Sequence, residues 1–231
     1  MPAGGISVIL PVLDEEHRIG RRLEELGATP GIREVIVVDG GSVDRTLEIV
    51  RGFPGIRVTT GPRGRGSQLN AGARLASGDV LLFLHADVSL PADAAAWVGG
   101  TLAEPGVVAG AFRTWTVPDE GRSWLAPFLH VADVRSRVAR LPYGDQAVFV
   151  RREAFLRVGG FPDQPLMEDV ELARRLRRVG RIRTIPAVVR VSGRRFIARP
   201  LSSVVLLRLV PLLYRMGVPP RVLARLYGGP R

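Results

Sequence analysis

The sequence predicts an α/β protein with a mainly parallel central sheet flanked by helices, followed by a helical C-terminal appendage. Two patterns indicate this fold. Short apolar runs alternate with helical segments in the order β-α-β-α-β-α-β, which is typical of a parallel sheet with right-handed crossovers. The run Val80–Leu84 is apolar throughout, as expected for a strand buried on both faces. A chain of 231 residues has room for one large domain, or for one domain with an appendage.

The first half of the chain contains regular elements separated by short turns. Apolar residues at helical spacing and a terminal glycine define a helix from Ile19 to Gly27. Ser42 or Asp44 is suited to cap the next helix, which runs through Val50. The other expected elements of this half are strands at Ile6–Leu10, Glu34–Asp39, Ile56–Val58 and Val80–Leu84 and a helix at Ser67–Ala76.

The second half has a less regular pattern. Residues 113–145 show no steady period, so we expect an inserted segment over the edge of the sheet. We divide the chain into a domain at residues 1–198 and a basic amphipathic helical segment at residues 199–231. The expected elements are helices at Pro91–Gly100, Arg152–Val158 and Glu168–Val179, strands at Val107–Phe112 and Ala147–Val150, and extended chain from Ile182 to Val191.

The composition excludes several kinds of site. With no cysteine, the chain has no disulfide, no thiolate metal site and no cysteine nucleophile, and it suits a reducing compartment. The apolar stretch Ile6–Leu10 is too short for a secretory signal. No apolar run approaches the ~18 residues that a membrane span needs. We therefore expect a cytoplasmic protein.

The charge is unevenly distributed along the chain. Residues 1–115 carry 11 Arg and 13 acidic residues, whereas residues 116–231 carry 22 Arg and 9 acidic residues. No acidic residue follows Glu171, and every basic side chain other than histidine is an arginine. The positive half predicts an anionic neighbour, which can be a diphosphate, a nucleic acid or an acidic membrane surface.

Acidic residues follow several of the predicted strands. Asp14 and Glu15 come after the first strand, Asp39 ends the second, and Asp87 follows the run Val80–Leu84. The carboxyl ends of parallel strands meet at one edge, where open α/β sheets bind their ligands. Acidic groups gathered there repel one another unless a cation or hydrogen-bond donors lie among them. A carboxylate at this edge can hold a divalent cation, which in turn can hold a phosphate.

Three further segments are ambiguous when taken alone. The loop Gly61–Gly66 carries two arginines and precedes a helix, so it suits a diphosphate, but a solvated loop is more typical of this pattern. Glu168 and Asp169 open a helix, where acids also serve the helix dipole. Tyr143–Gln146 has the composition of an ordinary turn.

Taken together and in order, six blocks of the sequence resemble family 2 glycosyltransferases, which have the GT-A fold. The same set is similar to a bacterial branch known as arsenosugar-biosynthesis-associated glycosyltransferases. The resemblance covers roughly residues 6–196. The blocks are Ser7–Glu16, Val37–Thr46, Gly64–Ala73, Phe83–Asp87, Tyr143–Gln146 and Pro165–Leu172.

The resemblance implies a nucleotide-binding half at residues 1–112 and an acceptor and catalytic half at residues 113–198. It assigns the nucleoside to the turn after the first strand and to Asp39, and the diphosphate region to the following loops. We also expect Arg194 and Arg195 to reach the donor diphosphate. The complete set expected to bind the nucleotide sugar is Pro11, Val12, Leu13, Glu15, Asp39, Ser42, Arg65, Gln68, Asn70, His85, Ala86, Arg194 and Arg195.

The resemblance also implies the catalytic and metal-binding residues. His85-Ala86-Asp87 occupies the place of the family's Asp-x-Asp motif, so Asp87 would hold Mg²⁺ or Mn²⁺, and His85 can itself be a ligand. Asp169 matches the family's general base, with Glu168 beside it. The acceptor or sugar would border Tyr143, Gly144, Asp145 and Gln146.

The resulting prediction is a metal-dependent, inverting, hexosyltransferase-like enzyme that moves a sugar from a nucleoside-diphosphate donor to a hydroxyl acceptor. The alternatives are a nucleotidyltransferase and a non-catalytic module that binds nucleic acid or anionic lipid. A dinucleotide oxidoreductase is disfavoured because the first strand leads into Pro11 rather than a Gly-rich turn. The main prediction includes no nucleic acid partner and leaves a homodimer open. For residues 199–231, a helix packed on the domain and a helix resting on the cytoplasmic face of an anionic membrane both fit the pattern.

Overall fold

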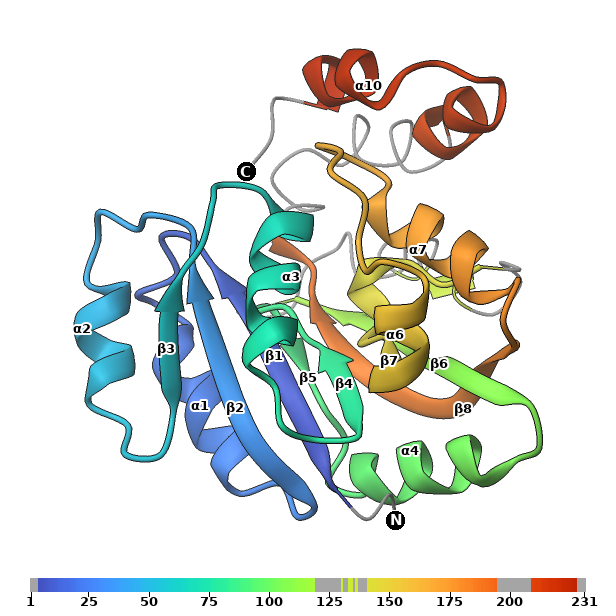
Figure 1. Ribbon diagram of the computed structural model, residues 1–231. Helices are drawn as coiled ribbons and strands as arrows, with labels where there is room; N and C mark the ends of the chain where they lie inside the picture. Colours follow the sequence, from blue (N-terminus) through green and yellow to red (C-terminus); the bar gives the residue numbers. More distant parts are fainter. Residues whose placement is uncertain are drawn as a thin grey trace.

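The computed structural model describes residues 4–118, 130, 133, 134, 136, 141–194 and 209–227. They form one eight-stranded sheet with the strand order β3-β2-β1-β4-β7-β6-β8-β5, with helices on both faces (Figure 1). The predicted α/β class with a sheet flanked by helices is confirmed. The elements of the first half are β1 (Ile6–Val12), α1 (Ile19–Gly27), β2 (Ile32–Asp39), α2 (Thr46–Arg51), β3 (Arg57–Thr60), α3 (Arg65–Leu75) and β4 (Val80–Phe83).

The sheet is parallel in its first half and mixed in its second. β1 pairs in parallel with β2 and β4, and β2 pairs in parallel with β3, as the alternating pattern predicts. β7 runs antiparallel to both β4 and β6, whereas β6 and β8 are parallel. The elements of the second half are β5 (Val88–Ser89), α4 (Ala94–Ala103), β6 (Val107–Val117), η1 (Gly144–Gln146), β7 (Phe149–Arg151), α6 (Arg152–Arg157), α7 (Glu168–Leu176), β8 (Arg181–Ser192) and α10 (Pro220–Tyr227).

The irregular segment expected from residue 113 onward is wrong at its start, because β6 continues to Val117. Thr114 and Thr116 are the buried side chains of this extension, and a buried threonine hides the apolar alternation of a strand. Asp133 supplies the hydrogen-bond acceptor for the buried polar groups of Thr116. Its carboxylate accepts hydrogen bonds from the Thr116 nitrogen at 2.9 Å and from Oγ1 at 2.8 Å. Most of residues 119–140 lie outside the described residues, so the rest of that expectation is not tested.

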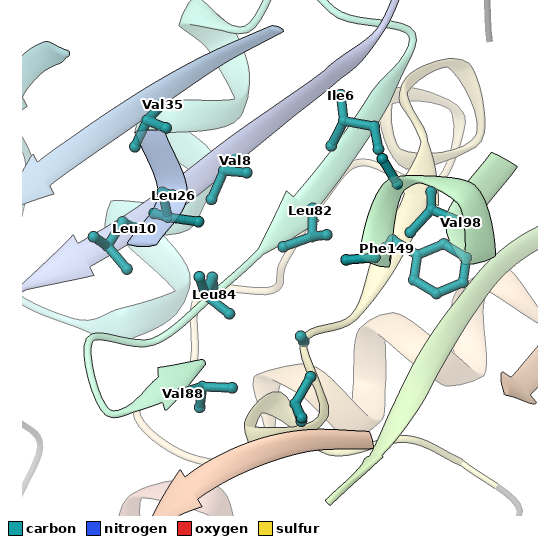
Figure 2. Packing of buried hydrophobic residues seen from close by; sticks show 14 of the residues in the cluster. Ile6, Val8, Leu10, Leu26, Val35, Leu82, Leu84, Val88, Val98 and Phe149 are labelled. Carbon is teal, nitrogen blue, oxygen red and sulfur yellow. The ribbon is translucent and has the colours of Figure 1, made fainter. Parts of the chain in front are cut away.

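The core has one layer on each face of the sheet. On one face, the alternating side chains of β1 and β4 pack against α1, α2 and α4. Figure 2 shows this layer, with Val8, Leu10 and Leu82 between the strands and the surrounding helices. On the other face, α3, α6 and α7 cover Ile9 and Phe83. The central strands are therefore buried on both faces, which explains their apolar runs.

A hydrogen-bond network around Glu34 links the amino ends of the strands, at the edge opposite the acidic strand ends. Glu34 in β2 accepts hydrogen bonds from the Ser7 hydroxyl in β1 and from the Ser77 nitrogen and hydroxyl, all at 2.7 Å. Its other oxygen accepts a hydrogen bond from Arg57 in β3 at 3.1 Å. Burial raises the pKa of Glu34, but these hydrogen bonds outweigh burial and lower the pKa to about 2. One carboxylate thus holds three neighbouring segments in register.

The C-terminal helices form a smaller layer beyond the sheet. Val210 and Leu223 are buried against Met167 and Val170 around the start of α7. Figure 1 shows these helices in red, next to α7 and on the side of the molecule opposite α4. Within the described ranges, no helix combines the length and apolar character that crossing a membrane requires.

We predict that Glu34 makes stability depend on acid pH. Its folded pKa lies near 2 and its ordinary value is 4.5, so its stabilisation is complete above pH 4.5 and is lost as the pH falls toward 2. The stabilisation amounts to about 3 kcal/mol. In urea titrations, Glu34→Gln should therefore lower the free energy of unfolding at pH 7 much more than at pH 3. A difference between wild type and variant that does not change with pH would contradict this role.

Candidate active site

The acidic strand ends converge as predicted. Val12 and Asp39 lie side by side at the carboxyl ends of the parallel strands β1 and β2. The backbone of Leu84 hydrogen-bonds to Ile9 at 3.0 Å, which brings the segment after β4 to the same edge. This edge therefore collects Asp14, Glu15, Asp39, His85 and Asp87.

Asp39 organises the turn that follows β2. Its side chain is 1% exposed and accepts hydrogen bonds from the nitrogens of Gly41 and Ser42 at 2.9 and 3.1 Å and from the Ser42 hydroxyl. Ser42 Oγ in turn accepts a hydrogen bond from the Asp14 nitrogen at 3.0 Å. The Asp14 carboxylate accepts one from the Val43 nitrogen at 2.9 Å. These hydrogen bonds link the turn after β1 to the turn after β2, and the two linked turns form one rim of the site. Pro11, Val12 and Leu13 lead into this rim.

Gln68 and Asn70 hold the base of the site. Gln68 is 4% exposed, and its side-chain amide donates to the carbonyls of Val12 at 3.0 Å and Val38 at 2.9 Å, so it ties β1 to β2. Asn70 exchanges two hydrogen bonds with the backbone of Phe161, at 2.9 and 3.0 Å. The structure thus gives both residues positioning roles, and their contact with a nucleotide stays a prediction.

An ion cluster joins α3 to α7. Arg65 Nε donates to Glu168, and an Arg65 terminal nitrogen lies 3.6 Å from Asp169 Oδ2. Glu168 is 2% exposed and Asp169 10%, whereas Arg65 is 37% exposed. Burial raises the pKa of Glu168, Asp169 raises it further, and Arg65 opposes both. Burial works against the charge of Arg65, but Glu168, Asp169 and Asp145 together raise its pKa.

Two backbone nitrogens fix the Asp169 carboxylate. Its Oδ2 accepts a hydrogen bond from the Gly144 nitrogen at 2.6 Å, and its Oδ1 accepts one from the Val170 nitrogen at 2.8 Å. A Cβ atom at Gly144 would lie 3.1 Å from His85 Nε2 and 3.3 Å from Asp169 Oδ2. His85, Gly144 and Asp169 therefore meet at one point, where glycine leaves the room that a side chain would fill.

The predicted acceptor segment divides into two kinds of residue. Gln146 is buried, donates to the Phe112 carbonyl at 2.9 Å, and accepts from the Tyr143 nitrogen at 3.0 Å, so it anchors the segment. Gly144 contacts the candidate base, and Asp145 adds its charge to the cluster around Arg65. This segment therefore lies at the candidate site, and its contact with an acceptor stays a prediction.

Backbone conformation marks two site residues that sequence reasoning missed. Within the described residues, the non-glycine residues with positive φ are Asp14, Ala147 and Met167. Ala147 directly follows η1, and Met167 directly precedes Glu168 at the start of α7. Such conformations are costly for residues with a side chain and cluster at functional sites. No sequence pattern at Ala147 or Met167 predicts a positive φ there.

A small cavity lies behind the cluster. Its volume is about 20 Å³, enough for roughly one water molecule. Arg65, His85, Glu168 and Asp169 line it together with Phe83, Leu172 and other apolar side chains. The acids therefore border an apolar interior, which accounts for the raised pKa of Glu168.

Two arginines, Arg194 and Arg195, are predicted to reach the donor diphosphate, and the structure describes the first of them. Arg194 follows β8, and its guanidinium donates to Glu15 at 3.0 Å, so it joins the end of β8 to the turn after β1. Its Nε is buried with no hydrogen-bond partner among the described residues. Arg195 lies outside the described residues.

The residues predicted to bind a metal ion are Asp87 and His85. Among the described residues, no group of three or more His, Asp or Glu side chains is placed to hold an ion. Asp87 and His85 together offer one carboxylate and one imidazole at the strand edge, beside the buried Arg22, whose Nε donates to the Ala86 carbonyl at 3.2 Å. This set fits a cation that takes most of its ligands from substrate phosphates and water, as Mg²⁺ commonly does, and does not fit a closed protein cage.

Residues 7–159 match glycosyl transferase family 2. The chain belongs to this family. The probable glycosyltransferase YdaM of Bacillus subtilis strain 168 is 30% identical over 213 residues, which cover 80% of this chain and 49% of that protein. The chain therefore spans about half the length of the curated relative it matches. The family match confirms the broad resemblance found in the sequence and does not separate out its narrower branch.

Solved structures share the fold. The mannosyltransferase PcManGT from Pyrobaculum calidifontis, in complex with GDP-Man and Mn²⁺, superposes with a TM-score of 0.67 at 26% identity, covering 94% of this chain and 66% of that one. S. aureus TarS 1-349 in complex with UDP-GlcNAc superposes with a TM-score of 0.62 at 20% identity, covering 81% and 58%. The GT-A architecture expected from the sequence is confirmed.

We predict that Arg65→Met destabilises the fold at pH 7 by about 1–3 kcal/mol, because the buried Glu168 carboxylate loses its charged partner. Removing Arg65 also removes the group that lowers the pKa of Glu168. Glu168 then binds a proton more readily, so the cost should be smaller at pH 5 than at pH 8. Chemical denaturation at the two pH values measures it.

A double-mutant cycle separates this pairing from general packing. In a Glu168→Gln background, Arg65→Met should cost much less than in the wild type. Arg63→Met, which changes an exposed arginine two residues before Arg65, is the matched control and should have little effect. An equal cost of Arg65→Met in both backgrounds would show that the ion pair does not stabilise the site.

Proposed function

We propose that the chain transfers a hexosyl group from a nucleoside-diphosphate donor to a hydroxyl acceptor, with inversion at the anomeric carbon. The observation that carries the proposal is the placement of Asp169. Its carboxylate is fixed by Gly144 and lies close to Arg65, and the same glycine also approaches His85, two residues before Asp87. Family membership supports transfer chemistry, and the 26% identical PcManGT, solved with GDP-Man and Mn²⁺, supports a nucleotide-sugar donor.

Asp169 acts as the general base in this proposal. It takes the proton of the acceptor hydroxyl while that oxygen forms a bond to the anomeric carbon. The bond from the anomeric carbon to the diphosphate oxygen breaks on the opposite face, and the electron pair leaves with the nucleoside diphosphate. The hydrogen bonds from Gly144 and Val170 fix the direction of the carboxylate before the acceptor arrives. Glu168 acts through Arg65, as a positioning residue.

The donor would lie along the carboxyl ends of β1, β2 and β4. The rim built by Asp39 and Ser42 would border the nucleoside, and the loop that enters α3 would face the diphosphate. Asp87 and His85 would hold the divalent cation, Mg²⁺ or Mn²⁺. When bound, such a cation offsets the negative charge that develops on the departing diphosphate. Arg194, held by Glu15, would line the same edge.

The narrower branch and the setting belong to this proposal as well. The motif blocks support the arsenosugar-associated branch, which does not by itself name a donor or acceptor. The cysteine-free composition supports a reducing, cytoplasmic setting. A thermal-shift screen of nucleoside diphosphates and their sugars, with and without Mn²⁺, would identify the donor, since a ligand at 100 times its Kd stabilises a protein by about 2.7 kcal/mol.

We predict that Asp169→Asn lowers the rate of transfer by roughly 10²–10⁴-fold, because the amide cannot accept the hydroxyl proton. Donor affinity should stay near the wild-type value. Calorimetry measures donor binding, and release of the nucleoside diphosphate measures turnover. Asp163→Asn changes an exposed aspartate before the same helix and is the control. Near wild-type turnover by Asp169→Asn would move the base elsewhere, and release of pyrophosphate would favour a nucleotidyltransferase.

We also predict that Asp87→Ala weakens binding of a nucleoside diphosphate at least tenfold in Mn²⁺ and changes it little in EDTA, because Asp87 would link the cation to the sheet edge. Titration calorimetry with GDP and with UDP gives the affinities without any need for turnover. The matched control is Asp93→Ala, which removes a carboxylate near the start of α4. Equal Mn²⁺-dependent affinities for the wild type and Asp87→Ala would refute the assignment.

A further inference from the structure

The two C-terminal helical segments, residues 209–215 and α10, have an inner face that packs on the catalytic domain. Val210 and Leu223 are buried together with Met167 and Val170. Tyr214 lies beneath the guanidinium of Arg174, 5.1 Å from it, and its hydroxyl is 3.5 Å from Gln164 Nε2. The segments are therefore seated on the start of α7, the helix that carries the candidate base.

The outer face of these segments carries exposed apolar side chains. Leu209, Leu212 and Met216 are 41%, 53% and 73% exposed and follow one another at spacings of three and four residues, so they share one face. Val222 on α10 is 45% exposed. Leu209, Leu212 and Met216 form an apolar surface of the kind that marks an interaction site, and Val222 adds an exposed apolar side chain on the next helix. We call these residues, with the arginines described next, the outer face.

Arginines accompany the apolar residues. Arg215, Arg221 and Arg225 are all exposed. Within the described ranges, no carboxylate forms an ion pair with any of these three guanidinium groups, and the sequence has no acidic residue after Glu171. The outer face therefore combines apolar bulk with positive charge that the described part of the chain does not neutralise.

We propose that the outer face docks on an anionic lipid bilayer, with its apolar side chains in the interface and its arginines among the headgroups. Amphipathic helices rich in basic residues lie in the interface in this way, and each basic residue near the surface adds to the binding. A second copy of the chain fits less well, because a symmetric contact would set like charges against one another. Nucleic acid offers no counterpart for the exposed leucine and methionine side chains.

Docking would hold the start of α7 one layer of helices away from the membrane surface. Met167 and Val170, which support the C-terminal segments, flank Glu168 and Asp169 on either side in the sequence. A hydroxyl acceptor carried by a membrane-borne molecule would then be held near Asp169. This last step rests on the proposed function, whereas docking itself does not depend on sugar transfer.

Vesicle co-sedimentation of the full chain tests the proposal without donor or acceptor. The protein should bind vesicles of phosphatidylglycerol and phosphatidylcholine at low salt at least tenfold more tightly than vesicles of phosphatidylcholine alone. Changing Arg215, Arg221 and Arg225 together to Gln should weaken binding to the anionic vesicles roughly 100-fold. The double variant Leu212→Asp/Met216→Asp should also lose binding. Equal binding to both kinds of vesicle, or unchanged binding by these variants, would overturn the proposal.

Two controls keep the result specific. Trp97→Asp changes a side chain that is 37% exposed on α4, on the other side of the molecule, and should bind vesicles like the wild type. Sedimentation equilibrium addresses the second copy, since a dimer that the Leu212→Asp/Met216→Asp variant dissociates would make a second copy the occupant and refute membrane docking. The melting temperature of each variant confirms that it is folded.

The absence of cysteine allows a second, independent readout. Met216→Cys and Ala96→Cys each create a single site for an environment-sensitive fluorophore, the first on the outer face and the second on α4. Anionic vesicles should shift the emission of the label at position 216 to the blue and leave the label at position 96 unchanged. Equal responses of the two labels would exclude an oriented contact through the outer face.

Discussion

The contact between Arg65 and Glu168 determines where the two halves of the site stand. The two residues are 103 positions apart and join the start of α3 to the start of α7. A carboxylate that is 2% exposed is costly unless a cation compensates it, so the fold keeps this pair together. Because Asp169 is the next residue, the pair also places the candidate base opposite Gly144. The C-terminal segments in turn pack on Met167 and Val170, so their position depends on the same contact.

Among the described residues, the non-glycine positions with positive φ are each held by neighbouring contacts. Asp14, Ala147 and Met167 have φ of 53°, 46° and 64°, and conformations of this kind cost of order 1–3 kcal/mol each. Each adjoins a group that the fold fixes by other means. Asp14 is hydrogen-bonded to the turn after β2, Ala147 follows the buried Gln146, and Met167 packs against Val210. The strain at these three positions is thus offset by neighbouring contacts.

The sequence predicts the parallel half of the fold because its strands carry a clear apolar signal and its turns are short. It also predicts that Asp39 and Asp87 share an edge, since parallel strands leave little choice. It does not predict that β7 runs antiparallel, because a strand of three residues carries no mark of direction. The structural use of Gln68 and Asn70 is also hidden, because the same amide groups suit a ligand or a buried carbonyl. Only the tertiary structure decides between the two.

Net charge is a poor guide to partners until the internal ion pairs are removed from it. The stretch after Glu171 has arginines and no acid, yet several of these arginines form ion pairs within the domain. Arg175 pairs with Glu171, Arg183 with Glu104, and Arg194 with Glu15, so acids from other parts of the chain neutralise them. Arg215, Arg221 and Arg225 form no such pair with a described residue. Exposed arginines also lie elsewhere on the domain, for example Arg177, Arg178 and Arg190. What distinguishes the C-terminal segments is that their arginines stand beside exposed apolar side chains, and that local combination, rather than the total charge, favours a lipid surface over a nucleic acid.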